Sequence, residues 1–166
     1  RTGQNDVRNI YPEPLFGRNA SDLPSRFQWD TPFVVSKFEP GTIYSAGNVV
    51  FKTTDEGLTW EAISPDLTTN DKSKQRSSGG PITKDNTSVE YYATIFAALE
   101  SPHEAGVLWC GSDDGLVQLS RDGGENWKDV TPPGLPEWTM INAIEAHPRN
   151  PAGLYVAATR YKLDDF

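Results

Sequence analysis

The sequence predicts an all-β protein built from repeated four-stranded antiparallel sheets, and three observations predict it. The 166 residues include 14 Gly and 13 Pro, which interrupt helical periodicity, so long helices are not expected. A short turn-forming motif that ends in Trp occurs twice. Short apolar segments recur around each copy of this motif in the same order, as successive strands of a sheet would.

The motif reads hydroxyl, any residue, Asp, any residue, Gly, any two residues, Trp. This spacing suits a tight hairpin in which the Asp side chain accepts bonds from backbone N–H groups. The Gly supplies a positive φ, and the Trp returns to pack over the turn. We therefore expect structural roles for eight residues, four in each copy: Thr53, Asp55, Gly57, Trp60, Ser120, Asp122, Gly124 and Trp127.

Two apolar segments separated by a turn precede each copy of the motif. They are 33–36 and 42–44 in the first unit, 94–97 and 107–109 in the second, and 141–144 and 153–156 in a third unit that has no motif. Without the polar stretch 68–86, the repeat is about 45 residues long, the size of a four-stranded propeller blade. The sequence therefore predicts an incomplete β-propeller of about two and a half blades.

The propeller region is expected to span 25–166, after an extended lead-in over 1–24 that has few apolar positions. A long loop over 68–90 separates the first two blades, and it is either a solvated surface excursion or a functional loop. The three blade units are expected at about 27–67, 91–132 and 136–166.

The two motifs, together with three phrases, resemble the Asp-box (BNR) repeat β-propellers. The phrases are WDTP at 29–32, WEAISPDL at 60–67 and GSDDGLVQL at 111–119. The resemblance is close to the sortilin-type N-terminal domains and to the bacterial BNR-repeat glycosyl hydrolases. It implies a propeller with Asp-box hairpins and an exported, periplasmic or extracellular protein. Because this repeat serves hydrolases, sorting receptors and assembly factors alike, it does not by itself imply one activity.

Charge and composition disfavour several classes of partner. The formal net charge of −8 repels phosphate backbones and anionic lipid, so neither nucleic acid nor membrane is expected as a partner. No cofactor or metal is expected, because His103 and His147 are far apart and lack ligand spacing. The single Cys110 lies in an apolar run and is interpreted as a buried structural thiol.

A propeller's ligand face is formed by the loops that lead into the innermost strands and those that join the second and third strands. The Asp-box turns lie on the opposite side. Aromatic rings at the blade entrances could stack on sugar rings as a glycan platform, or simply pack between adjacent blades. The aromatic candidates for ligand binding are Trp29, Tyr91, Tyr92 and Trp138.

Catalysis would need carboxylates near the same face. A glycosidase uses two carboxyl groups about 5 to 9 Å apart, one with a raised pKa. The candidates are Asp30, Glu90, Asp113 and Asp114. For Asp113 and Asp114 the alternative is an ordinary β-turn, because they lie between Gly111 and Gly115. None of the arginines matches the context of the arginine triad in sialidases of this fold.

Three functions stay open on the sequence alone. The chain is a binding or scaffold module for a glycan, protein or peptide, or a fragment of a glycoside hydrolase whose site other blades or subunits complete. The third option is that it only completes a larger barrel. Isolated blades expose apolar faces, so we also expect contacts with other copies of the chain or with the rest of a parent propeller.

Overall fold

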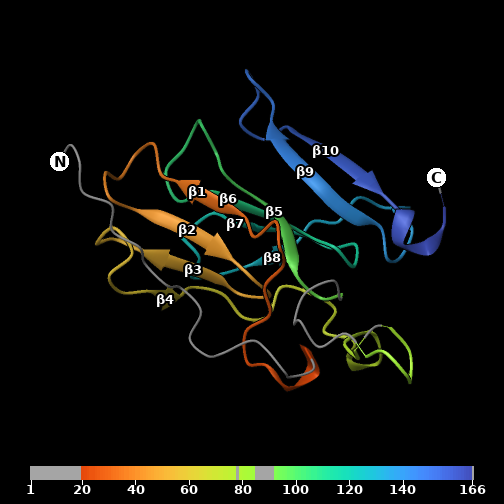
Figure 1. Ribbon diagram of the computed structural model, residues 1–166. Helices are drawn as coiled ribbons and strands as arrows, with labels where there is room; N and C mark the ends of the chain where they lie inside the picture. The colour runs from red at the N-terminus through yellow and green to blue at the C-terminus, as the bar shows by residue number, and fades with distance from the viewer. Residues whose placement is uncertain (1–19, 78, 85–91, 166) are drawn as a thin grey trace, which may run out of the picture.

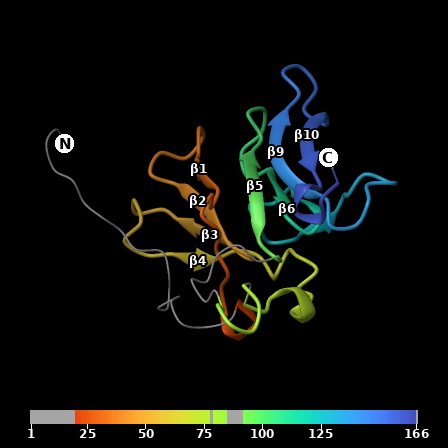
Figure 2. The same cartoon turned by 45° about the vertical axis from the view of Figure 1, so that its right-hand side comes forward.

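The computed structural model describes residues 20–77, 79–84 and 92–165, and it confirms the all-β prediction. Three antiparallel sheets lie side by side like a fan, with the second sheet between the other two (Figures 1 and 2). The helical segments of the described residues are short 3-10 turns that lie outside the strands. None of these segments is long and apolar enough to cross a membrane.

Each complete sheet is a meander whose strands pair in chain order. The first contains β1 (Phe33–Val35), β2 (Ile43–Ala46), β3 (Val50–Thr53) and β4 (Glu61–Ala62). The second contains β5 (Ile95–Glu100), β6 (Leu108–Ser112), β7 (Val117–Ser120) and β8 (Lys128–Asp129). The third holds β9 (Met140–Ala146) and β10 (Leu154–Thr159). This is the predicted set of two whole blades and part of another.

The lead-in predicted over 1–24 is described only from residue 20, and there it is not extended. Residues Ala20–Asp22 form a 3-10 turn, η1, because the Leu23 N–H donates to the Ala20 carbonyl at 3.2 Å. Both Ala20 and Leu23 are buried, so apolar packing holds this turn against the sheets. The other two 3-10 turns are η2 (Lys72–Lys74) and η3 (Tyr161–Leu163).

The core consists of two apolar layers, one on each face of the second sheet. Side chains alternate between the faces of a strand, and β6 follows this rule closely. Leu108 and Cys110 pack against the first sheet, whereas Trp109 packs against the third. Cys110 is buried in the first layer, and this burial raises the pKa of its thiol.

Glycine lets the second and third sheets approach closely. A side chain at Gly111 of β6 would come within 2.3 Å of Ile141, which is fully buried on β9. A larger residue at this position would therefore force the two sheets apart, since cores are packed without spare volume.

The two repeated motifs form turns with the same hydrogen bonds. In the first turn the Gly57 N–H donates to Thr53 Oγ1 and the Thr59 N–H donates to Asp55 Oδ1, both at 2.9 Å. The bond from the Thr59 N–H is the largest of the contacts that lower the pKa of Asp55 to about 2. The second turn repeats these bonds with Ser120, Asp122, Gly124 and Asn126 in the corresponding places.

The second turn also joins its sheet to the preceding one. Trp127 Nε1 donates to the carbonyls of Ile63, just after β4, and of Gly124, both at 3.0 Å. Trp60 holds the corresponding position in the first motif, yet its buried Nε1 has no hydrogen-bond partner in the described part of the chain. No sheet of the described structure lies before the first, so Trp60 has no counterpart of the Ile63 carbonyl.

We expect Gly124→Ala to lower the free energy of unfolding by about 1 to 3 kcal/mol, because a side chain there would overpack the inter-sheet contact. It would come within 2.8 Å of the Ile63 carbonyl oxygen. Gly123→Ala is the matched control, because both glycines have positive φ but Gly123 has nothing within 4 Å of an added Cβ. Urea unfolding of both variants measures the difference, and equal losses would contradict this assignment of the contact.

Candidate functional site

Side chains from distant parts of the chain gather at one edge of the fan, called the site edge below. It is the edge at which β5 and β9 begin, and it contains the turn between β6 and β7, the loop around η2, and η3. In Figure 1, η1 and the loop around η2 lie together below the sheets. The repeated hairpin turns occupy the opposite edge, where the Gly123 N–H donates to the Gly106 carbonyl.

Asp113 lies in the turn after β6 and is fully buried. Its carboxylate accepts the backbone N–H groups of Ala93 and Thr94, both at 2.9 Å. These bonds hold Ala93 at a φ of 72°, a left-handed conformation that a residue with a side chain rarely adopts without such support. The carboxylate therefore fixes the path of the chain into β5.

Lys162 of η3 supplies the charge that opposes Asp113. Its Nζ lies 3.1 Å from Asp113 Oδ2, and its side chain is only 20% exposed. Burial raises the pKa of Asp113 above its usual value, while the neighbouring Lys162 ammonium and the Thr94 N–H oppose the rise. The pair links the second sheet to the chain beyond β10.

Asp114 anchors the long loop that follows the first sheet. Its carboxylate accepts the Thr69 N–H at 2.9 Å and the Thr69 hydroxyl at 2.7 Å, and also the Ser112 hydroxyl. Further along this loop Gln75 is fully buried, and its carbonyl accepts the Ser21 N–H. The loop is thus anchored to the site edge at Thr69 and Gln75, while Lys72–Lys74 between them is exposed.

Two aromatic rings meet between the second and third sheets at this edge. The ring centroids of Tyr92 and Trp138 are 5.1 Å apart, with an interplanar angle of 66°. Lys162 Nζ lies 4.7 Å from the Tyr92 ring centroid and Lys74 Nζ lies 5.5 Å from that of Trp138. Both rings are half-buried and Lys74 is exposed, so the cluster combines packing between blades with access from solvent.

Backbone strain marks the same place. Trp138 has a φ of 62°, and like Ala93 it stands just before the Thr that leads into an inner strand. Burial, followed by the charge of Asp113, raises the pKa of Tyr92, whose buried hydroxyl has no hydrogen-bond partner among the described residues. Strained residues and unsatisfied polar groups are often found at functional sites.

The remaining predicted site residues are not part of this cluster. Trp29 is 73% exposed and Asp30 is also exposed, both in the turn before β1. Glu90 and Tyr91 lie outside the described residues. His103 and His147 belong to the opposite edge, where His103 Nε2 lies 2.8 Å from the His147 carbonyl oxygen. Across the described residues, no three His, Cys, Asp or Glu side chains are grouped as metal ligands.

Arg26 is a central residue of the site edge that sequence reasoning missed. It is 1% exposed, its Nε donates to the Ala93 carbonyl at 2.9 Å, and its Nη2 donates to Asp66 Oδ2 at 2.6 Å. Although burial raises the pKa of Asp66, bonds from Thr68 and Arg26 outweigh it and lower that pKa. Asp66 belongs to the phrase at 60–67, which offered the one sequence signal for this pair.

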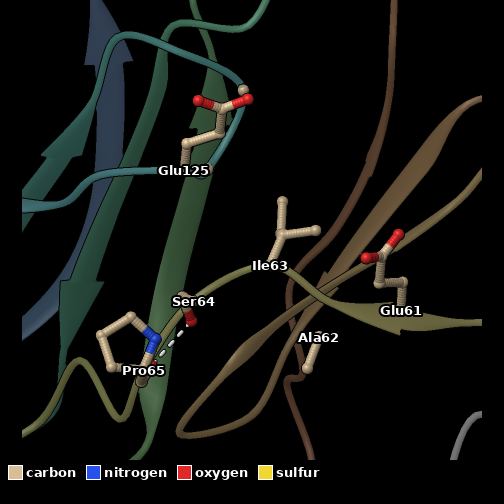
Figure 3. A pocket seen from close by; sticks show the side chains of 8 residues that line it. Glu61, Ala62, Ile63, Ser64, Pro65 and Glu125 are labelled. Atoms are coloured by element: carbon tan, nitrogen blue, oxygen red, sulfur yellow. Dashed lines mark hydrogen bonds between the residues drawn. The ribbon is translucent and has the colours of Figure 1, made fainter.

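A pocket of about 410 Å³ lies away from the site edge, at the seam between the first two sheets. Figure 3 shows the side chains of Glu61 and Glu125 on either side of Ile63. Ser64, which also lines it, already accepts the Val50 N–H and donates to the Pro65 carbonyl. The pocket is a groove between packed blades, lined by the exposed carboxylates of Glu61 and Glu125 and by the side chain of Ile63.

No family model matches the chain, and no curated protein matches it. Among solved structures, it is similar to the crystal structure of an ancestral GH74 enzyme, a β-propeller glycoside hydrolase, with a TM-score of 0.54 and 17% sequence identity. The match covers 82% of this chain and 14% of the enzyme's. At this identity the likeness supports the propeller fold, and the chain spans a small part of the enzyme's length.

We expect Lys162→Met to destabilise the fold increasingly as the pH rises. A buried carboxyl whose folded-state pKa is raised stabilises the fold at low pH, and this contribution is lost as the pH rises through that pKa. Removing the ammonium raises the pKa of Asp113 further. The loss of unfolding free energy should therefore begin to grow at about pH 4 and should reach about 1 to 3 kcal/mol near pH 8.

Urea unfolding across this pH range measures the effect. The exposed Lys128 of β8 provides the control variant Lys128→Met. A loss that is the same at every pH would show that Lys162 acts through packing alone.

Proposed function

We propose that this chain is part of a β-propeller binding module that holds a glycan at its site edge. The Tyr92–Trp138 ring pair, flanked by Lys74 and Lys162, is the observation that carries the proposal. Aromatic faces stack on the apolar faces of sugar rings, and lysine ammonium groups donate hydrogen bonds to sugar oxygens. A site of this kind needs a rigid support, which the strands and the buried Asp113 provide.

Further aromatic surface lies at the same edge. Trp29 is 73% exposed before β1, and Tyr161 is 49% exposed in η3. Rings before the first, second and third sheets, and after the third, would let an extended glycan contact several blades. A protein or peptide ligand is the other occupant that such a surface suits.

The carboxylates favour binding over hydrolysis. Asp113 and Asp114 are at most 3% exposed, and each accepts several hydrogen bonds from its own chain. A general acid or nucleophile must reach the substrate, and these two side chains are committed to holding the backbone. Three of the four candidate carboxylates lie within the described residues, and Asp30 is the exposed one of these three.

The alternative function is a fragment of a glycoside hydrolase. The structural likeness to an ancestral GH74 enzyme favours it, and the match to 14% of that chain means that other parts would have to complete a catalytic pair. An exported location accompanies either proposal and rests on the family resemblance.

We expect the full chain to bind glycans on an array. Trp138→Ala should raise the dissociation constant about tenfold, which is the effect of losing one stacked ring. Phe38→Ala is the control, because Phe38 is a 40% exposed aromatic residue in the turn after β1, at the opposite edge. Titration calorimetry with a glycan found on the array measures both constants. Equal weakening by both variants, or no glycan binding at all, would contradict the proposal.

The same glycans separate binding from hydrolysis. We expect no release of reducing sugar when they are incubated with the chain. Turnover that Asp30→Asn or Asp114→Asn abolishes would instead support the hydrolase alternative, because it would place a working carboxylate at the site edge.

A further inference from the structure

We infer that the outer face of the first sheet binds the outer face of the third sheet in a second copy of the chain, head to tail. The first surface, called the leading face, contains Phe33, Val35, Ile43 and Phe51. The second, called the trailing face, contains Ala143, Glu145, Tyr155 and Ala157. Strand register places each set on one side of its sheet, turned away from the second sheet.

The leading face is apolar, and its β1 part is open to solvent, whereas Phe51 stacks on the buried ring of Phe27. Phe33 is 59% exposed and Val35 is 61% exposed, although both lie in a strand of a packed sheet. Val34 between them packs into the core against the second sheet. Large apolar side chains that are grouped and exposed in this way mark a surface for association.

Two buried polar atoms of the first sheet are consistent with a neighbour that supplies hydrogen-bond partners. Trp60 Nε1 and Ser45 Oγ are buried there, and neither has a hydrogen-bond partner among the described residues. In the second sheet the equivalent tryptophan, Trp127, lies against the preceding sheet and donates to the Ile63 carbonyl. The first sheet thus repeats the design of the second, and no sheet of the described residues precedes it.

The two interfaces inside the chain show how such sheets fit together. Each places an aromatic residue of its second strand on the side that meets the following sheet: Tyr44 lies in the core between the first and second sheets, and Trp109 in the core between the second and third. A trailing face therefore always meets a leading face, and never one of its own kind.

Tyr155 is the third residue of this series, and among the described residues the His147 ring stacks on it without a further sheet beyond. Equivalent backbone bonds run from Ser36 to Thr42, from Ser101 to Val107 and from His147 to Gly153, so the residues two positions later correspond. Those residues are Tyr44, Trp109 and Tyr155. Leu154 and Val156 on either side pack inward, while Tyr155 is 56% exposed.

A second copy is the occupant that these observations specify. Within the described residues, one chain carries both a leading face with exposed Phe33 and Val35 and a trailing face with exposed Tyr155, and its own interfaces join one face of each kind at every seam. The resulting contact is heterologous, so copies would add head to tail into a ring or an open filament.

The test uses the full chain in sedimentation velocity and light scattering over a range of concentrations. We expect the unaltered chain to associate as its concentration rises. Val35→Lys on the leading face and Tyr155→Lys on the trailing face should each weaken association by at least about tenfold, because each would bury a lysine charge in the contact. Ile82→Lys is the control, because Ile82 is 93% exposed in the loop and belongs to neither face.

Mixing the two blocked variants tests the head-to-tail geometry. The Val35→Lys chain keeps its trailing face and the Tyr155→Lys chain keeps its leading face, so together they should form a 1:1 dimer that grows no further. A chain that is monomeric at every concentration would overturn the inference. So would a mixture that stays monomeric, or a Tyr155→Lys chain that still self-associates, which would mean that leading faces pair with each other. Circular dichroism of each variant verifies that it is folded.

Discussion

The packing of the second sheet on both of its faces is the constraint on which the described structure depends. Strand β6 sends Leu108 and Cys110 toward the first sheet and Trp109 toward the third, and it reaches Gly111 where β9 comes too close for a side chain. Burial of this kind contributes about 25 cal/mol for each Å² of apolar surface removed from water. The outer sheets have such a neighbour on one side, which explains why their remaining faces carry exposed apolar residues.

Buried charge organises the site edge in the same way that apolar packing organises the sheets. Asp113 holds the path into β5 and pairs with Lys162 beyond β10, while Arg26 joins the Ala93 carbonyl to Asp66 after the first sheet. Breaking a buried pair leaves an uncompensated charge, so these contacts tie segments from both ends of the described chain to one place. The aromatic pair lies directly on this support.

Much of the architecture could be predicted from the sequence, because its signals are local. The Asp, Gly and Trp spacing predicted two hairpin turns, and the recurring apolar segments predicted two four-stranded sheets and part of a third. The roles of the site residues could not be predicted as well. Asp113 and Asp114 were weighed between catalysis and a turn, and only their buried contacts with Thr94 and Thr69 show how each carboxylate is used. Arg26 and Lys162 carried no signal of their own.

The sequence by itself determined the repeat, the turns and the alternation of apolar residues, since each depends on residues a few positions apart whose backbone preferences are intrinsic. Only the tertiary structure decided which side chains share a site. Asp113 meets Lys162 and Arg26 meets Asp66 and Ala93 across long stretches of chain, and such pairs form only when the packing of one sheet against the next brings them together. Sheet packing also decided which faces stay open, because a strand's pattern shows that a face is apolar but not whether anything covers it.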